Sequence, residues 1–247
     1  MNHQISGIHH ITAIAGEPQT NLDFYAGVLG LRLVKLTVNF DDPGTYHLYY
    51  GDGAGRPGTI MTFFPWPHAP KGRRGTGQVT QTAFAIPENA MAFWTTRLAG
   101  AGVVFQGPFD RFGEQAISFA DPDGMGLELI ATKHAGEEQA YEAGPVPLEF
   151  AIRGFHSATL SQTSHRETAA LLTGTMGFTP AGQDGNRFRY ITNAGGPAAT
   201  VDVLESPGER PSRVLVGTVH HIAWRTPDDE QQRYWLADLT RRNYGVS

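Results

Sequence analysis

Apolar and polar residues alternate in short segments along this chain, and longer amphipathic stretches separate some of these segments. The first group has an apolar segment at 10–14, an amphipathic stretch at 21–30, and alternating segments at 31–35, 46–50 and 59–63. Alternation with a period of two is typical of a strand with one buried face. The stretch that ends at Gly30 has the spacing and the stop signal of a helix. The pattern predicts the order βαβββ.

The same order recurs along the chain. Similar segments begin at His10, Gln81, His156 and His221, at intervals of 71, 75 and 65 residues. The fourth group has only its first strand and a helix, from Asp228 to Asn243, before the sequence ends. A repeated supersecondary unit indicates one packed architecture. We therefore expect an α+β fold of four βαβββ units, the fourth incomplete, that form curved, barrel-like mixed sheets.

A segment rich in Glu, Gly and Pro lies between the second and third units, at 135–147. Such composition is typical of a linker. We expect residues 1–134 to contain the first pair of units and residues 148–247 to contain the second pair, with the last unit truncated.

Composition limits the chemistry. Of the 247 residues 40% are hydrophobic and 17% are charged, which is typical of a globular protein, and the net charge of -5 disfavours nucleic acid and anionic membranes as partners. Without cysteine there can be no thiolate ligand, so a metal ion would need His and carboxylate ligands. No apolar run is long enough to span a bilayer, and we expect a cytoplasmic protein.

Three motifs carry a resemblance to a known family. The HHIT segment at 9–12, the turn at 121–124 and the strand at 127–129 resemble the vicinal-oxygen-chelate superfamily, the glyoxalase/bleomycin-resistance/extradiol-dioxygenase group. The segments 21–25, 38–50 and 63–66 resemble, more narrowly, the hydroquinone-type ring-cleaving dioxygenases. The resemblance covers nearly the whole chain. It implies an enzyme that cleaves the ring of a dihydroxylated aromatic with O2.

The resemblance also implies a site. In that family Fe(II), or in some members Mn(II), is held by one His of the first unit, one His of the fourth and a Glu near the end of the fourth. The matching ligands are His10 and His221, and His9, Thr12 and His220 would line the substrate pocket as acid/base or hydrogen-bonding groups. The strand that carries the Glu would lie beyond the end of this sequence. A homodimer is a further implication of the resemblance.

Other interpretations of the same residues remain open. A His pair on a strand can have one buried and one solvated ring without any function. His156 also begins a unit and competes with His10 as a ligand, and Glu128 stands where the superfamily often has a carboxylate. His47 is expected to be a pocket wall or a packed strand residue and not a ligand. The aromatic run at 63–67 suits a substrate cleft or the core equally. The alternative functions are a glyoxalase-like isomerase, a resistance protein, or an inactive or binding fragment without the final Glu.

Overall fold

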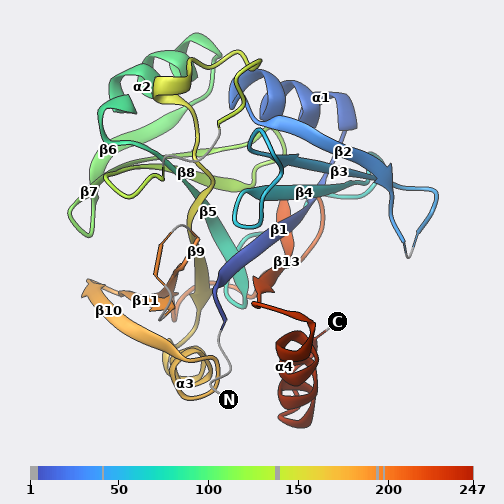
Figure 1. The fold of residues 1–247 in the computed structure, drawn as a ribbon, viewed down its shortest axis with the longest axis vertical. Helices are drawn as coiled ribbons and strands as arrows, with labels where there is room; N and C mark the ends of the chain where they lie inside the picture. Colours follow the sequence, from blue (N-terminus) through green and yellow to red (C-terminus); the bar gives the residue numbers. More distant parts are fainter. Residues whose placement is uncertain (1–4, 41, 137–139, 193–194, 197, 247) are drawn as a thin grey trace.

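The computed structural model describes residues 5–40, 42–136, 140–192, 195–196 and 198–246, and Figure 1 shows their arrangement. Helices α1 and α2 lie at one end of the molecule and helices α3 and α4 lie at the other, with the strands between them. The chain therefore places its helices outside two curved sheets.

The elements follow the predicted repeat. The first unit contains β1 (Gly7–Ala15), α1 (Pro18–Leu22), the π-helical η1 (Asp23–Val28), β2 (Arg32–Val38), β3 (Tyr46–Gly51) and β4 (Ile60–Pro65). The second contains β5 (Gln78–Pro87), η2 (Glu88–Ala90), α2 (Met91–Gly100), β6 (Phe105–Arg111), β7 (Glu114–Ala120) and β8 (Gly126–Thr132). The third contains β9 (Phe155–Gln162), α3 (Arg166–Gly174), β10 (Phe178–Asp184), β11 (Arg187–Thr192) and β12 (Thr200–Glu205), preceded by η3 (Leu148–Phe150), and the fourth contains β13 (Thr218–Arg225) and α4 (Asp229–Arg241). The α+β fold with three complete units and an incomplete fourth is confirmed.

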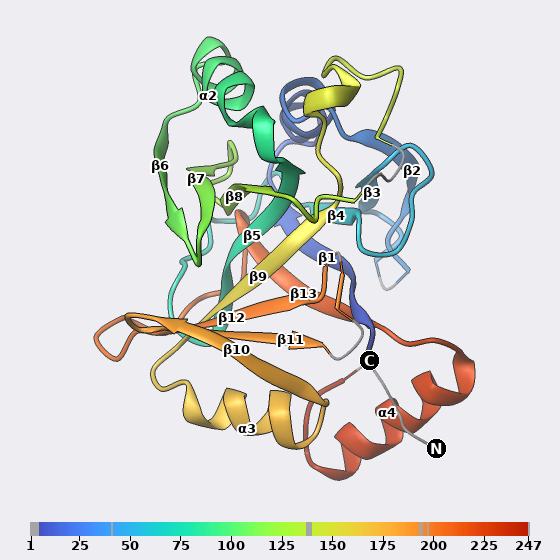
Figure 2. The same cartoon turned by 60° about the vertical axis from the view of Figure 1, so that its left-hand side comes forward.

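The strands form two sheets that join distant units. The first sheet has the order β13-β1-β4-β3-β2, and the second has the order β10-β11-β12-β9-β5-β8-β7-β6. The first unit therefore shares a sheet with the fourth, through the antiparallel pair β1/β13, and the second shares a sheet with the third, through the antiparallel pair β5/β9. Figure 2 shows β1 beside β13 and β5 beside β9 in the middle of the molecule.

The domain boundary expected at 135–147 stays a prediction. The two sheets group the units differently, the first with the fourth and the second with the third. Both sheets combine strands from the two sides of that segment. The main core does the same: Ile11 of β1, Phe84 of β5 and Phe155 of β9 are fully buried in one cluster, where the Phe84 and Phe155 rings stack with centroids 5.3 Å apart. The two halves of the chain are thus packed together.

Two elements differ from the sequence-based expectation. No strand was predicted at 178–184, yet β10 forms there as the edge of the larger sheet, with only Phe178 buried. An exposed edge strand needs no apolar alternation, which is why the pattern did not indicate it. The single helix expected at 21–30 is instead a short α-helix that continues as a π-helix to Val28.

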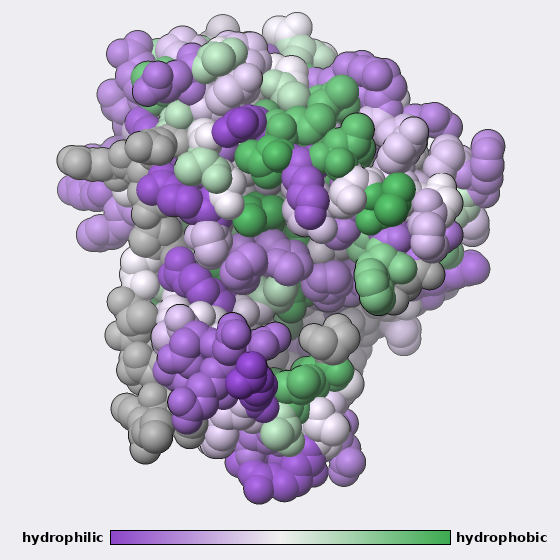
Figure 3. Space-filling model, turned by 45° about the vertical axis from the view of Figure 1, so that its right-hand side comes forward, coloured by the Kyte–Doolittle hydropathy of each residue, from purple (hydrophilic) through white to green (hydrophobic). Residues whose placement is uncertain are grey.

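The surface has both apolar and polar regions. Figure 3 shows hydrophobic residues gathered in the upper half of one face, among hydrophilic ones. Leu36 and Val38, on the edge strand β2, and Tyr46 on β3 are at least half exposed. Exposed apolar residues on an edge strand are typical of a contact surface, but the expected homodimer stays a prediction.

None of the described helices is both long and apolar enough to cross a membrane.

Candidate metal centre

Two β-bulges lie in the strand pair β1/β13, one on each strand. The extra residue is His9 in β1 and His220 in β13, because the pairing register skips each of them. A bulge changes the direction of the side chains beside it. The rings of two consecutive histidines can therefore lie side by side on each strand, and need not point to opposite faces.

The four histidine rings form one hydrogen-bonded cluster. Nδ1 of His9 lies 2.9 Å from Nδ1 of His10, and Nδ1 of His220 lies 2.8 Å from Nδ1 of His221. The Nε2 atoms of His10 and His221 face each other across the strand pair, 3.4 Å apart. His10 and His221 are thus the inner histidines of the cluster, and His9 and His220 are the outer ones. Each inner histidine has its Nδ1 beside the outer histidine of the same strand and its Nε2 directed at the other inner histidine.

This arrangement fits part of a metal site. Nitrogens 3.4 Å apart can both contact one ion at the usual metal–imidazole distance of about 2.0–2.1 Å. Ligand histidines commonly use their second nitrogen in a hydrogen bond that fixes the ring, which is the role that His9 and His220 have here. Among the described residues, however, no group of three or more His, Asp or Glu side chains is arranged to hold an ion.

Lowered pKa values favour the neutral form of His9, His10 and His221, which metal binding requires. Burial, with smaller effects from the neighbouring histidines, lowers the pKa of His10 to about 4. The pKa of His221 is lowered by burial and then by His220, and that of His9 by burial and then by the charge of Arg225. At neutral pH the three rings are therefore uncharged.

A row of polar side chains extends from the histidines across the sheet. Thr12 pairs with His221 on β13 and with Thr62 on β4, and Thr62 pairs with Tyr49 on β3. The hydroxyl oxygens of Thr12 and Thr62 are 2.8 Å apart, and Nε2 of His47 lies 2.9 Å from the Thr62 hydroxyl. Thr12 is thus buried beside the histidine cluster and is connected to His47.

The aromatic run after β4 divides between the site and the core. Phe64 lies against His47, with ring centroids 4.3 Å apart, and against the edge of His220 at 5.9 Å. Phe63 points to the other face, where it packs against Tyr25 at 4.5 Å in the core. One residue of this run therefore belongs to the candidate site and its neighbour to the core, as strand alternation requires.

A cavity of about 600 Å³ opens beside the histidines, between β13 and α4. His10 and His221 line one side of it, and Trp224, Trp235 and Leu236 supply apolar surface. This volume is within the range of small-molecule sites, which are mostly apolar with a few polar groups. An aromatic ring could lie here within reach of both Nε2 atoms.

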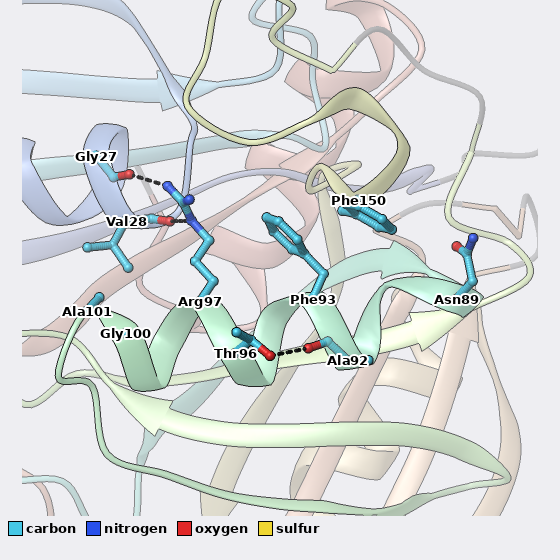
Figure 4. A pocket seen from close by; sticks show the side chains of 10 residues that line it. All are labelled: Gly27, Val28, Asn89, Ala92, Phe93, Thr96, Arg97, Gly100, Ala101 and Phe150. Carbon is cyan, nitrogen blue, oxygen red and sulfur yellow. Dashed lines mark hydrogen bonds between the residues drawn. The ribbon is translucent and has the colours of Figure 1, made fainter.

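A second cavity, drawn in Figure 4, has a larger volume of about 820 Å³ but different chemistry. It lies against α2, where Phe93 stacks on Phe150 with centroids 4.7 Å apart and Arg97 donates hydrogen bonds to the carbonyls of Gly27 and Val28. Its lining contains no histidine and no carboxylate. We therefore do not regard it as the metal centre.

Two other candidates lie outside the histidine cluster. His156 is on β9 in the larger sheet, where its ring nitrogens lie 2.9 Å from a Glu114 oxygen and 3.0 Å from the Ser157 hydroxyl. Glu128, on β8, accepts a hydrogen bond from Arg111 at 2.7 Å. Each side chain is thus already partnered within the larger sheet.

Sequence reasoning did not single out Thr62 or Tyr49. Both lie on the histidine-bearing face because their strands pair in register with Thr12, and Tyr49 lies two residues after His47. The alternation of β3 could have linked Tyr49 to His47. The link from Thr62 to Thr12 required the strand order.

Comparisons with known proteins agree with this fold. Residues 7–129 match the model of the Glyoxalase/Bleomycin resistance protein/Dioxygenase superfamily. The chain is 49% identical to MhqO of Bacillus subtilis, provisionally named a ring-cleaving dioxygenase, over 98% of this chain and 76% of that protein. It is 36% identical to a chlorohydroquinone/hydroquinone 1,2-dioxygenase of Sphingobium indicum, over 98% of this chain and 77% of that one.

Solved structures give the same result. A crystal structure from Bacillus subtilis, provisionally named a dioxygenase, has a TM-score of 0.93 and 48% identity over all of this chain and 78% of its own. Glyoxalase I from Zea mays has a TM-score of 0.68 at 13% identity, over 95% of this chain and 79% of its own, which shows a shared fold alone. With the repeated units and the extent of the sequence identity, these matches establish that this chain belongs to the glyoxalase/bleomycin resistance protein/dioxygenase superfamily.

Proposed function

We propose that this chain is a dioxygenase that uses Fe(II), or Mn(II) in its place, to open the ring of a hydroquinone or a related dihydroxylated aromatic with O2. The observation that carries the proposal is the convergence of the Nε2 atoms of His10 and His221, 3.4 Å apart, in a chain similar to a hydroquinone dioxygenase. We assign these two residues as metal ligands. The third ligand, a carboxylate, is assigned to no residue that the structure describes.

The metal would supply open coordination positions for the substrate and O2, which is typical of sites with two histidines and one carboxylate. The protein's own contribution begins with ring orientation. When Nε2 of His10 is a ligand, its proton is on Nδ1 and is donated to Nδ1 of His9, 2.9 Å away. The same reasoning applies to His221 and His220.

This orientation also fixes which ring nitrogen His9 and His220 present to the substrate. Because Nδ1 of His9 accepts a hydrogen bond, the ring carries its own proton on Nε2, and His220 is in the same state. We assign both as hydrogen-bonding and acid/base groups for the substrate: in this state each ring donates its Nε2–H to a substrate oxygen, and a ring takes up a hydroxyl proton only when its Nδ1 is released by the neighbouring histidine. Thr12 is assigned a hydrogen bond to an oxygen of the substrate.

The apolar side of the site accounts for the substrate class. Phe64 borders His47 and His220, and the tryptophans of the cavity add aromatic surface beside His10. Such walls favour a flat ring and exclude water, so a hydroquinone suits this site better than a small aliphatic substrate.

Oxygen consumption tests the proposal. The chain would be loaded anaerobically with Fe(II) and mixed with hydroquinone in an oxygen electrode, and we expect O2 uptake together with the absorbance of a ring-opened product. His156→Ala serves as the matched control because this histidine also begins a repeat unit but lies on β9, and it should retain the uptake. Iron that binds without any uptake would contradict the proposal and support the alternative of a binding protein.

A further inference from the structure

Four side chains form a continuous hydrogen-bonded row across three neighbouring strands. The Tyr49 hydroxyl lies 2.9 Å from Nδ1 of His47, and Nε2 of His47 lies 2.9 Å from the hydroxyl of Thr62. The Thr62 hydroxyl lies 2.8 Å from that of Thr12. The row therefore runs from β3 through β4 to β1. It ends at Thr12, which pairs directly with His221 on the adjacent strand β13.

The environment of the row keeps its members in place. Thr12 and Thr62 are fully buried, and the His47 ring is held between Tyr49 and Phe64, with centroids 4.1 and 4.3 Å away. Burial, with smaller effects from His221 and Lys35, lowers the pKa of His47 to about 4, so that its ring has one proton at neutral pH. Burial also raises the pKa of Tyr49, which keeps its hydroxyl protonated.

Thr62 is buried and has a single hydroxyl hydrogen, and its hydrogen-bond partners among the described side chains are Thr12 and His47. A buried donor without an acceptor is costly, so Thr62 donates to one partner and accepts from the other, and the row has one direction. If Tyr49 donates to Nδ1 of His47, then Nε2–H donates to Thr62 and Thr62 donates to Thr12. The Thr12 hydrogen is then left for an acceptor outside the row. In the opposite direction Thr12 donates to Thr62 and can only accept from other groups. The direction of the hydrogen bond between Tyr49 and His47 thus determines whether the Thr12 hydroxyl can donate a hydrogen bond outside the row.

A phenol is a stronger donor than an aliphatic hydroxyl, and an imidazole nitrogen is a strong acceptor, which favours the first direction. We propose that Tyr49 and His47 are positioning residues that, through Thr62, hold the Thr12 hydroxyl as a hydrogen-bond donor to an oxygen atom of the bound aromatic substrate. This inference rests on the proposed function for its substrate. The direction of the row is a property of the protein alone and can be measured without metal or substrate.

The first test is the tautomer of His47 in the metal-free chain, measured by long-range proton–nitrogen NMR correlation with His47→Gln used for assignment. We expect a neutral ring with its proton on Nε2. In Tyr49→Phe, Nδ1 loses its donor and the ring should become a mixture of tautomers. A proton on Nδ1 in the unmutated chain, or a mixture there, would overturn the proposed direction.

The second test is turnover of hydroquinone by iron-loaded variants. Thr62→Val replaces the hydroxyl by a methyl group and interrupts the row, and we expect kcat to fall about tenfold, the effect of one lost hydrogen bond, with little change in KM. Thr62→Ser restores the hydroxyl and should restore kcat. Tyr46→Phe, the same change as Tyr49→Phe at an exposed position of β3, should have no effect.

The outcomes separate the two proposals. If the unmutated chain consumes no O2 while His47 has its proton on Nε2, the proposed function fails and the direction of the row stands. If the unmutated chain turns over but Thr62→Val has an unchanged kcat, or Thr62→Ser loses as much as Thr62→Val, the row does not position Thr12 and the inference is overturned.

Discussion

The strand pairs β1/β13 and β5/β9 have the same backbone design and carry different chemistry. Both are antiparallel, and both join the first strands of two repeat units. Both contain one bulge on each strand: the extra residues are His9 and His220 in the first pair, and Thr80 and His156 in the second. The repeat has therefore preserved the bulges in both sheets.

The residues beside the bulges differ. His10 and His221 correspond by register to Gln81 and Ser157. On the neighbouring parallel strand, the position of Thr62 in the first sheet is taken by Glu128 in the second. One pair thus presents two imidazoles, and the other presents an amide and a hydroxyl next to a buried carboxylate.

Arginines neutralise the carboxylates of the second region. Glu128 is paired with Arg111 at 2.7 Å, and Asp202, at the equivalent position on β12, is paired with Arg189 at 2.8 Å and Arg187 at 3.2 Å. Guanidinium groups here hold the positive charge that a metal ion would supply. The fold thus provides a bulged strand pair in both sheets, and the side chains beside the bulges determine whether that pair can bind a cation.

Metal binding gives the largest expected difference between the two regions. His10→Ala and His221→Ala should each abolish stoichiometric Fe(II) binding, because each removes one of two converging imidazoles. The register-equivalent changes Gln81→Ala and Ser157→Ala are the matched controls and should leave binding intact. Metal content after anaerobic loading and desalting measures the effect. Equal losses in the two sets of variants would show that the regions do not differ in this way.

The second region, in contrast, is expected to contribute to the stability of the fold through its buried ion pairs. Asp202→Ala leaves Arg187 and Arg189 buried without their main partner, so we expect a loss of about 3–5 kcal/mol in the free energy of unfolding. Asp184→Ala, at an exposed position of the edge strand β10, should cost far less. Urea unfolding followed by circular dichroism measures both. A cost for Asp202→Ala close to that of Asp184→Ala would mean that this ion network contributes little to the fold.

Much of the fold could be predicted because its signals are local. The alternating segments and the recurrence of similar segments at His10, Gln81, His156 and His221 predicted the four units. The edge strand β10 was missed because nearly all of its residues are exposed. Which units share a sheet was also not predictable, since pairing between distant strands leaves no periodic pattern in either segment.

The candidate site was predictable only in part. The resemblance indicated the His pairs, but simple alternation assigns two neighbouring rings to opposite faces, and only the bulges at His9 and His220 bring the rings together. The bulges also change the alignment of the repeats: by register His156 corresponds to His220, whereas the spacing had matched it to His221. The row from Tyr49 to Thr12 joins three strands and follows from the strand order.

The smallest expected difference is in the pH dependence of stability. In the folded chain the pKa of His10 and that of His47 are about 4, below the ordinary 6.5 that they regain on unfolding. Between those values these two rings bind more protons in the unfolded chain, so their contribution to the free energy of unfolding should fall as the pH decreases from about 6.5 to about 4. The loss should be modest because His47 is only half-buried and its charge would be screened.

Urea midpoints of the metal-free chain at pH 7 and pH 4.5 measure this difference. His47→Gln removes one of the histidines of the first sheet whose pKa is lowered, and it should reduce the change in midpoint between the two pH values. His68→Gln, in an exposed segment after β4, is the control for the loss of one histidine and should retain the full change. A His47→Gln chain with the same pH dependence as the unmutated one would mean that burial beside Phe64 does not hold this ring neutral, and that the first sheet tolerates charge as readily as the arginine-rich second one.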